Sequence, residues 1–310
     1  MNYHNPNKIS RLLRPYFRQI VRSSLKEDIG KRDITTELTI PKDKRVKAVL
    51  LAKEDGVVCG LNVAAGVFKE IDKKIKFKPL VLEGQPVKKG KIIARIEGKA
   101  QSILTAERVA LNFLSLLSGI ATKTREYVDR IKPYKVNPAF ARKGRVKIMD
   151  TRKTIPGLRE LQKYAVRVGG GVNHRMRLDE MVLIKDNHLR VQSSKFKVQS
   201  SIRKKIPKDT KIEIEVKNLR EFKEALRAEP DIIMLDNMKI PDIRKAIKIK
   251  RNTQYLPAGR QGAIRNTLIE ASGGITLANV KKVAATGVDM ISIGELTHSL
   301  KSMDISLEVI

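Results

Sequence analysis

The sequence lacks tryptophan, and aromatic residues make up only 4% of its 310 positions. Proteins that bind single-stranded nucleic acid stack bases on exposed aromatic side chains, so this scarcity argues against that class. Cys59 is the single cysteine. It excludes an intramolecular disulfide and a metal site of paired thiolates, and it fits the reducing cytoplasm, where we expect this chain to reside.

Long hydrophobic runs are also missing. No stretch approaches the roughly 20 consecutive apolar residues that span a bilayer, so we expect no membrane partner. Residues 1–22 are polar and basic without an apolar signal core, and we therefore expect no secretion. The hydrophobic fraction of 41% is that of a folded globular protein, and 310 residues suffice for one large or two ordinary domains.

Acidic residues are few relative to basic ones, with 33 Asp and Glu against 64 Lys and Arg and a formal charge of +31. The electrostatic field of such a positively charged protein attracts nucleic acid, phosphate-rich metabolites or carboxylates. The lysines are spread along the chain, which favours a solvated surface over a nucleic-acid-binding stripe. The segment 248–266 has five basic residues and no acid. We interpret it as an exposed insertion, with a nucleic-acid-binding arm as the less favoured alternative.

The first 130 residues predict a helix followed by a small β-rich domain. Residues 8–29 carry apolar side chains at three- and four-residue steps, typical of a helix. Short β-branched runs alternate with turn-forming residues and predict strands at 45–51, 56–59 and 91–96. Residues 105–131, with Thr105 as N-cap, predict a long helix that is apolar around most of its circumference and therefore buried.

From residue 131 onward, a short apolar run followed by a helical pattern recurs six times. The runs lie at 146–149, 181–184, 212–216, 232–235, 268–271 and 290–293. Alternating strands and helices indicate a parallel sheet, and the lack of a Gly-x-Gly-x-x-Gly turn favours a βα barrel over a dinucleotide-binding sheet. We expect two domains: residues 1–130, ending in the long helix, and residues 131–310, a barrel with the insertion near 248–266 and a C-terminal tail.

Polar residues follow each of these runs, at the place where the active site of a βα barrel lies. Four cations lie near strand ends or on a connecting loop: Arg152, Lys153, Arg175 and Lys185. They would repel one another unless an anion lay between them, and arginine binds carboxylates through two parallel hydrogen bonds. The ligand should therefore carry several negative charges.

Glu215 and Asp236 are the acidic counterpart of these cations. Two facing carboxylates suit Mg²⁺, which commonly joins such groups to substrate phosphates. The alternative is an ion pair of Glu215 with Lys153 or Lys185. Glycines near strand ends let backbone N–H groups approach a phosphate. We therefore expect a phosphate-binding site at Ser272, Gly273, Gly274 and Gly294. Together these groups predict phosphoribosyl transfer onto an acidic acceptor.

The motif series resembles that of the quinolinate phosphoribosyltransferase family over roughly residues 12–300. The resemblance rests on EDIG (27–30), DITT (33–36), AER and Asn (106–112), DTRKT (150–154), GGGVNHR (169–175), LIKDNH (183–188), LDNM (235–238), EASGGI (270–275) and IG with LTHS (293–299). It implies an N-terminal α/β sandwich-like domain and an incomplete, TIM-like C-terminal βα barrel. It also implies a homodimer, or a hexamer as a larger assembly, in which Arg108 reaches the neighbour's active site.

The activity implied is Mg²⁺-dependent phosphoribosyl transfer from phosphoribosyl pyrophosphate to quinolinate with decarboxylation, which gives nicotinate mononucleotide for NAD biosynthesis. By resemblance, the quinolinate-binding residues are Arg108, Arg152, His174, Arg175 and Lys185. Those for phosphoribosyl pyrophosphate are Thr151, Lys153, Ser272, Gly273, Gly274, Gly294 and His298. The metal ligands would be Glu215 and Asp236, and the catalytic residues Lys153, Lys185, Glu215 and Asp236.

Two alternatives remain open. One is a sibling phosphoribosyltransferase of the same fold that acts on another acidic acceptor. The other is a non-enzymatic basic protein that binds nucleic acid. Such a protein has no need of acids such as Glu215 and Asp236 among its basic residues, so we expect no nucleic-acid partner.

Overall fold

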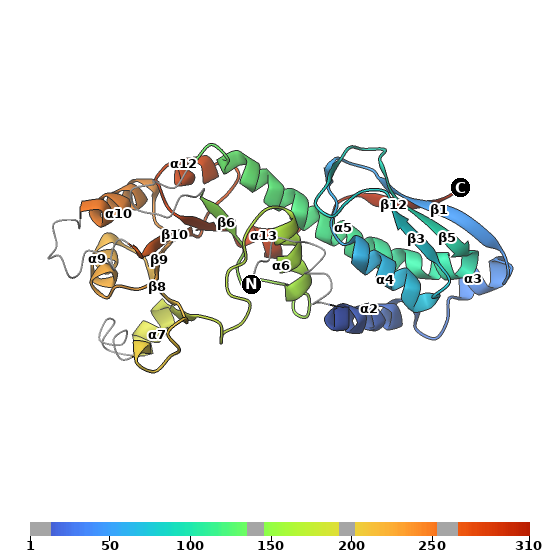
Figure 1. Cartoon of the computed structure of the whole chain (residues 1–310), viewed down its shortest axis with the longest axis horizontal. Coiled ribbons are helices and arrows are strands. Elements are labelled where there is room, and N and C mark those ends of the chain that lie inside the picture. Colours follow the sequence, from blue (N-terminus) through green and yellow to red (C-terminus); the bar gives the residue numbers. More distant parts are fainter. Residues whose placement is uncertain (1–13, 135–145, 192–201, 253–265) are drawn as a thin grey trace. The chain divides into compact units, whose positions relative to one another are not determined.

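The computed structural model describes residues 14–134, 146–191, 202–252 and 266–310, which form two compact units (Figure 1). Among these residues, the first unit holds 14–125, 155–170 and 299–310, and the second holds the remainder. The units are therefore not contiguous in sequence. A single cut near residue 130 would separate two segments from the unit to which they belong.

The first unit is built on a four-stranded antiparallel sheet of order β12-β1-β5-β3. Its strands are β1 (Arg45–Ala52), β3 (Lys76–Pro79), β5 (Ile92–Lys99) and β12 (Ile305–Val309). A separate ribbon pairs β2 (Gly56–Val57) with β4 (Pro86–Val87). β12 pairs with β1 from Ala48↔Val309 to Ala52↔Ile305, and this long-range pairing is why the C-terminal tail belongs to the first unit.

The first unit also contains a helix that the sequence analysis missed, α4 (Leu61–Ile71). Its buried residues follow helical spacing and include Leu61, Ala64 and Phe68. Helix α4 packs against β3 and against α2 (Arg14–Ile29), which lies inside the segment expected to be helical. The Glu83 carboxylate accepts hydrogen bonds from the first backbone N–H groups of α4, at 2.7 Å from Leu61 N. It thereby caps a helix whose preceding residue, Gly60, has no side chain to do so.

Helix α5 spans Ala100–Ile131, so it begins five residues before the expected start. Thr105 as its N-cap was wrong: this residue lies inside the helix, and its hydroxyl donates to Asp33 at 2.9 Å. Asp33 itself caps α3 (Ile34–Thr39) by accepting from the Thr36 N–H group. Strand β5 ends at Lys99 and the helix begins at the next residue, so no loop separates them.

Helix α5 is long and apolar enough to cross a membrane, contrary to the expectation from the sequence that no stretch would be. Its apolar window is, however, 61% buried inside the protein, as in the core helix of a globular domain. Fully buried side chains along it include Ile103, Leu114 and Leu117. This confirms that the helix is buried, as its all-round apolar pattern indicated.

The second unit contains a six-stranded parallel sheet of order β6-β11-β10-β9-β8-β7. Its strands confirm the six apolar runs: β6 (Lys147–Met149), β7 (Val182–Ile184), β8 (Ile212–Val216), β9 (Ile232–Asp236), β10 (Leu268–Ser272) and β11 (Met290–Ser292). Among the described residues, β6 and β7 at the two ends of this order do not pair with each other. The βα barrel is therefore incomplete, as expected.

Helices α9 (Leu219–Arg227), α10 (Ile240–Asn252) and α12 (Val280–Ala284) follow β8, β9 and β10. Helix α9 packs against β8 and β9, and α10 contacts both α9 and α12, so these helices cover the sheet on one side (Figure 1). The other helices are α6 (Arg159–Val168) of the first unit, and α7 (Asp186–Val191) and α13 (Glu295–His298) of the second.

The expected basic insertion at 248–266 begins inside α10. Residues 248–252 are helical, and Lys250 is buried with its Nζ 3.8 Å from Asp289 Oδ2. The assignment of an exposed insertion was thus wrong for this first turn, because Lys250 packs into the unit. Residues 253–265 lie outside the described part of the chain.

Candidate active site

Nearly all the expected site residues lie in the second unit, most of them at the carboxyl ends of its parallel strands. In a parallel sheet these ends lie at one edge. The second unit contributes Thr151, Arg152, Lys153, His174, Arg175, Lys185, Glu215, Asp236, Ser272, Gly273, Gly274, Gly294 and His298. Arg108 is the exception: it lies on α5 in the first unit, and its side chain is exposed.

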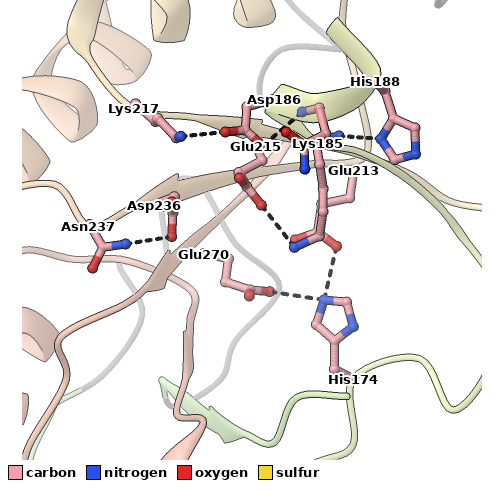
Figure 2. Close-up of polar contacts among 11 residues, drawn as sticks. His174, Lys185, Asp186, His188, Glu213, Glu215, Lys217, Asp236, Asn237 and Glu270 are labelled. Atoms are coloured by element: carbon pink, nitrogen blue, oxygen red, sulfur yellow. Dashed lines mark hydrogen bonds and ion pairs between the residues drawn. The ribbon is translucent and has the colours of Figure 1, made fainter. Parts of the chain in front are cut away.

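An ion pair joins the ends of the neighbouring strands β7 and β8 (Figure 2). Lys185 Nζ lies 3.2 Å from Glu215 Oε2, and the Glu215 side chain is only 8% exposed. The backbone N–H group of Lys185 donates to His188 Nδ1 at 3.0 Å. The pairing of Glu215 with Lys185, which the sequence left open, is therefore present.

Asp236 lies on the same face of the sheet as Glu215. Glu215 is opposite Met234 on β9, and Asp236 follows two residues later, so both carboxylates point to one side. Asp236 Oδ1 accepts from the Asn237 amide at 3.0 Å. Lys217 pairs with Asp186 at 2.6 Å, and its pKa is raised first by that hydrogen bond and further by Asp236 and Glu215. Two hard carboxylates on one face form a donor set suited to Mg²⁺.

The turn that contains His174 is tied to the end of β6. Asp150 is fully buried and accepts the backbone N–H of His174 at 3.0 Å, and it also accepts the Asn173 amide. His174 Nδ1 accepts the backbone N–H of Arg175 at 2.9 Å. This assignment leaves the ring proton on Nε2, which lies 3.0 Å from Glu213 Oε2.

Glu213 and Glu270 are buried acids that the sequence analysis did not assign to the site. Both are 0% exposed, and Glu270 Oε2 lies 3.8 Å from His174 Nε2 (Figure 2). Burial raises the pKa of Glu213 to about 7, and burial together with the nearby Glu213 carboxylate raises the pKa of Glu270 to about 8. Charged residues in the middle of the buried strands β8 and β10 were the signal that could have identified them.

Arg152 and Arg175 form a cationic pair. Burial lowers the pKa of Arg175, and the nearby Arg152 guanidinium lowers it further, whereas Glu213 raises it. Arg175 Nη1 donates to the Met181 carbonyl at 2.8 Å, which fixes the direction of the side chain. A dianion between the two guanidinium groups would relieve their mutual repulsion.

The glycines after β10 and β11 lie where a side chain would meet neighbouring atoms. Gly273 has φ +86°, and a Cβ there would overlap Asn237 Oδ1, so a side chain is excluded. A Cβ on Gly294 would lie 3.0 Å from the His298 ring and 3.4 Å from Lys153 Cδ. Lys153 and His298 therefore both approach Gly294.

Family models of both halves match the chain. Residues 33–118 match the N-terminal domain of quinolinate phosphoribosyl transferase, and residues 120–308 match its C-terminal domain. The chain belongs to the quinolinate phosphoribosyl transferase family. The resemblance inferred from the motifs is thereby confirmed.

Curated members of the quinolinate phosphoribosyl transferase family are similar along almost the whole chain. A probable nicotinate-nucleotide pyrophosphorylase (carboxylating) of Methanocaldococcus jannaschii is 42% identical over 303 residues, which are 96% of this chain and 99% of that protein. Its counterpart in Synechocystis is 41% identical over 286 residues, covering 92% and 90%. Among solved structures, the nicotinate-nucleotide pyrophosphorylase of Francisella tularensis has a TM-score of 0.84 at 38% identity and 96% coverage of both chains.

Proposed function

We propose that this member of the quinolinate phosphoribosyl transferase family transfers phosphoribosyl from phosphoribosyl pyrophosphate to quinolinate and releases CO₂ and pyrophosphate. The product is nicotinate mononucleotide, a precursor of NAD. The observation that supports this most directly is the cationic pair Arg152 and Arg175, in the same unit whose sheet carries the carboxylates Glu215 and Asp236 on one face. The relatives that match along almost their whole length are named for this activity.

Quinolinate carries two adjacent carboxylates, and we assign their binding to Arg152, Arg175 and Lys185. Each guanidinium can bind one carboxylate through two hydrogen bonds. His174 would lie beside them, since its backbone joins directly to Arg175. Binding holds the pyridine nitrogen in line with ribose C1, and such positioning supplies much of the rate acceleration.

In the first chemical step the pyridine nitrogen forms a bond to ribose C1 while the bond from C1 to pyrophosphate breaks. Positive charge develops on the sugar ring, and Glu215 or Asp236 offsets it. Lys153, beside Gly294 and His298, offsets the charge on the leaving pyrophosphate. The backbone of Ser272, Gly273 and Gly274, with Thr151, would hold phosphate oxygens.

In the second step the 2-carboxylate departs as CO₂. The electron pair of the broken bond is stabilised by the adjacent pyridinium nitrogen made in the first step, and a proton then replaces the carboxylate. This step needs no covalent bond to the protein. Glu215 and Asp236 would hold Mg²⁺, which supplies charge neutralisation for the phosphate oxygens of the substrate.

The same proposal includes a homodimer in the cytoplasm, in which the exposed Arg108 reaches the partner's site. Its exposure on α5 leaves the guanidinium accessible to a second chain. Cys59 is free and buried, which is compatible with a reducing compartment. Sedimentation of the purified protein would test for the dimer. Mixing the Arg108→Ala and Arg175→Ala variants would test the shared site: each variant alone should be inactive, and a dimer formed from one chain of each should regain activity.

The decisive test of the activity supplies quinolinate, phosphoribosyl pyrophosphate and Mg²⁺ and follows nicotinate mononucleotide and CO₂ together. We expect equal amounts of both products, and a loss of at least about 100-fold in kcat/KM for Arg175→Ala. The matched control is Arg227→Ala, an exposed arginine on α9 that should leave the rate unchanged. No product from folded protein would contradict the proposal and favour another acidic acceptor.

A further inference from the structure

Glu213 and Glu270 reach the same point from two strands that flank β9. Glu213 lies on β8 and Glu270 on β10, and both side chains point toward the His174 ring (Figure 2). Both carboxylates are fully buried. Burying an acid inside a sheet costs free energy unless the acid is hydrogen-bonded or paired with another group. The mechanism proposed above uses neither residue, so their burial calls for a separate role.

The His174 ring is held on both sides by neighbouring groups. Its Nδ1 accepts the backbone N–H of Arg175, and its Nε2 lies 3.0 Å from Glu213 Oε2 and 3.8 Å from Glu270 Oε2. Glu213 therefore receives the only ring proton of the neutral imidazole, which fixes the tautomer. The Glu270 carboxylate is near the same ring nitrogen but farther from it than the Glu213 carboxylate is.

The immobilised ring in turn fixes the turn that contains Arg175. Asp150 holds the backbone N–H of His174 from the opposite side, so the residue is anchored through both backbone and side chain. The Arg175 N–H is bonded directly to the ring. A rotation of the imidazole would move the backbone from which the Arg175 guanidinium extends.

We propose that Glu213 and Glu270 are positioning residues of the quinolinate site, which hold the His174 ring and, through it, the backbone of Arg175. This inference rests on the proposed function, because it assigns the effect to quinolinate binding. It assigns no contact between either glutamate and the substrate. It also distinguishes Glu213, which contacts the ring directly, from Glu270, which supports Glu213 and the ring at longer distance.

Two other roles for the buried acids would each have a consequence that differs from that of a positioning role. If Glu213 served only as a counter-charge to Arg152 and Arg175, its neutralisation would leave the site more cationic and strengthen the binding of a dianion. If His174, Glu213 and Glu270 held a divalent cation, for which their ligand atoms lie within 4.8 Å of one another, chelation would reproduce the effect of the substitutions.

The test compares Glu213→Gln, which keeps an oxygen acceptor, with Glu213→Ala, which removes it. We expect the KM for quinolinate to rise about 10-fold or more in Glu213→Ala and clearly less in Glu213→Gln, with the KM for phosphoribosyl pyrophosphate within about 2-fold of wild type. Glu270→Gln should have a smaller effect than Glu213→Ala. Glu224→Gln on α9 is the matched control and should change neither constant.

A spectroscopic measurement covers the case in which Glu213→Ala fails to fold. The ¹⁵N shifts of the His174 ring, assigned by their loss in His174→Asn, should report a proton on Nε2 in the wild type and a smaller share of that tautomer in Glu213→Gln, because a neutral amide oxygen is a weaker acceptor than a carboxylate. Calorimetric titration of Glu213→Gln with quinolinate should show weaker binding.

Tighter quinolinate binding in Glu213→Gln, or an unchanged tautomer together with an unchanged KM, would overturn the inference. So would a stoichiometric metal ion in the purified protein that is lost in Glu270→Gln. Each of these results is distinct from failure of the proposed function, in which the wild type itself makes no nicotinate mononucleotide.

Discussion

Lys185 Nζ lies 3.2 Å from Glu215 Oε2, and this ion pair joins the ends of the neighbouring strands β7 and β8. Glu215 is almost fully buried, whereas the Lys185 side chain remains 48% exposed. The ammonium can therefore contact an anionic ligand from solvent while it still neutralises the carboxylate. A metal ion at Glu215 would have to share that carboxylate with Lys185.

Replacement of the ammonium should separate its two roles. In Lys185→Met we expect kcat/KM to fall about 100-fold, or about 2.7 kcal/mol, because quinolinate loses a cation. The Mg²⁺ concentration for half-maximal activity should fall as well, since no ammonium competes for Glu215. Initial rates of nicotinate mononucleotide formation measured against Mg²⁺ after chelator treatment check both effects, with Lys223→Met on α9 as control. Full activity of the chelated wild type would contradict the metal assignment.

Glu270 should make the stability of the protein depend on pH. Its pKa is raised by burial, and further by Glu213, from 4.5 to about 8. Between these values the folded state keeps a proton that the unfolded state has released. The free energy of unfolding should therefore decrease as pH rises from about 4.5 to about 8, by up to about 1.4 kcal/mol for each pKa unit. Urea unfolding across this range should show a shallower decrease for Glu270→Gln, and an identical slope in both proteins would refute the assignment.

The buried pair Lys250 and Asp289 should stabilise the second unit mainly because neither charge can be buried alone. Burial lowers the pKa of Lys250 and raises that of Asp289, and each partner opposes the shift of the other. Asp289 also accepts the backbone N–H of Ile269 at 2.8 Å. We expect Lys250→Met to lower the free energy of unfolding by about 3 kcal/mol, because it removes the buried cation that pairs with the Asp289 carboxylate.

A second substitution provides the control for this pair. In Lys250→Met with Asp289→Asn the lone buried charge is gone, and we expect the double variant to recover much of the lost stability. Denaturant unfolding of the wild type, both single variants and the double variant gives the coupling free energy. Additive losses would show that the two side chains do not interact.

The sequence predicted the six strands of the second unit because each is a short apolar run that is buried along its length, as β8 is at all five positions. It also predicted the ion pair of Glu215 with Lys185 as one of two possibilities, since strand ends are adjacent in a parallel sheet. Glu213 and Glu270 interrupt these apolar runs, yet their partner, His174, comes from a turn far away in sequence. No local pattern indicates which side chain a buried acid will meet.

The predictions that were wrong or missing concern features that are likewise decided by contacts between distant parts of the chain. Helix α4 lies between short strands in a segment rich in β-branched residues, and its packing against α2 and β3 decides its conformation. Thr105 has the chemistry of an N-cap, but its hydroxyl bonds Asp33 instead. The pairing of β12 with β1 joins positions more than 250 residues apart, and depends on contacts that form only in the folded chain.

Tyr127 connects the two loops assigned to phosphate binding. Its buried hydroxyl donates to Glu295 at the start of α13, and it accepts the backbone N–H of Leu277, which follows β10. Both burial and the Glu295 carboxylate raise the pKa of Tyr127, so the phenol keeps its proton and remains a donor at physiological pH. The hydroxyl therefore joins Leu277, in the segment that follows Gly274, to Glu295 of the Gly294–His298 turn.

Tyr127→Phe removes this hydroxyl and keeps the ring. We expect the KM for phosphoribosyl pyrophosphate to rise about 10-fold, because the loss removes the hydrogen bond from the hydroxyl to Glu295 and lets the two turns shift independently. The KM for quinolinate should stay within about 2-fold, since Arg152 and Arg175 lie on other loops. Tyr164→Phe in the first unit, where the hydroxyl is also buried, is the control: it should change stability and neither KM. An equal rise in both constants would mean that Tyr127 supports the whole unit and not the phosphate turns in particular.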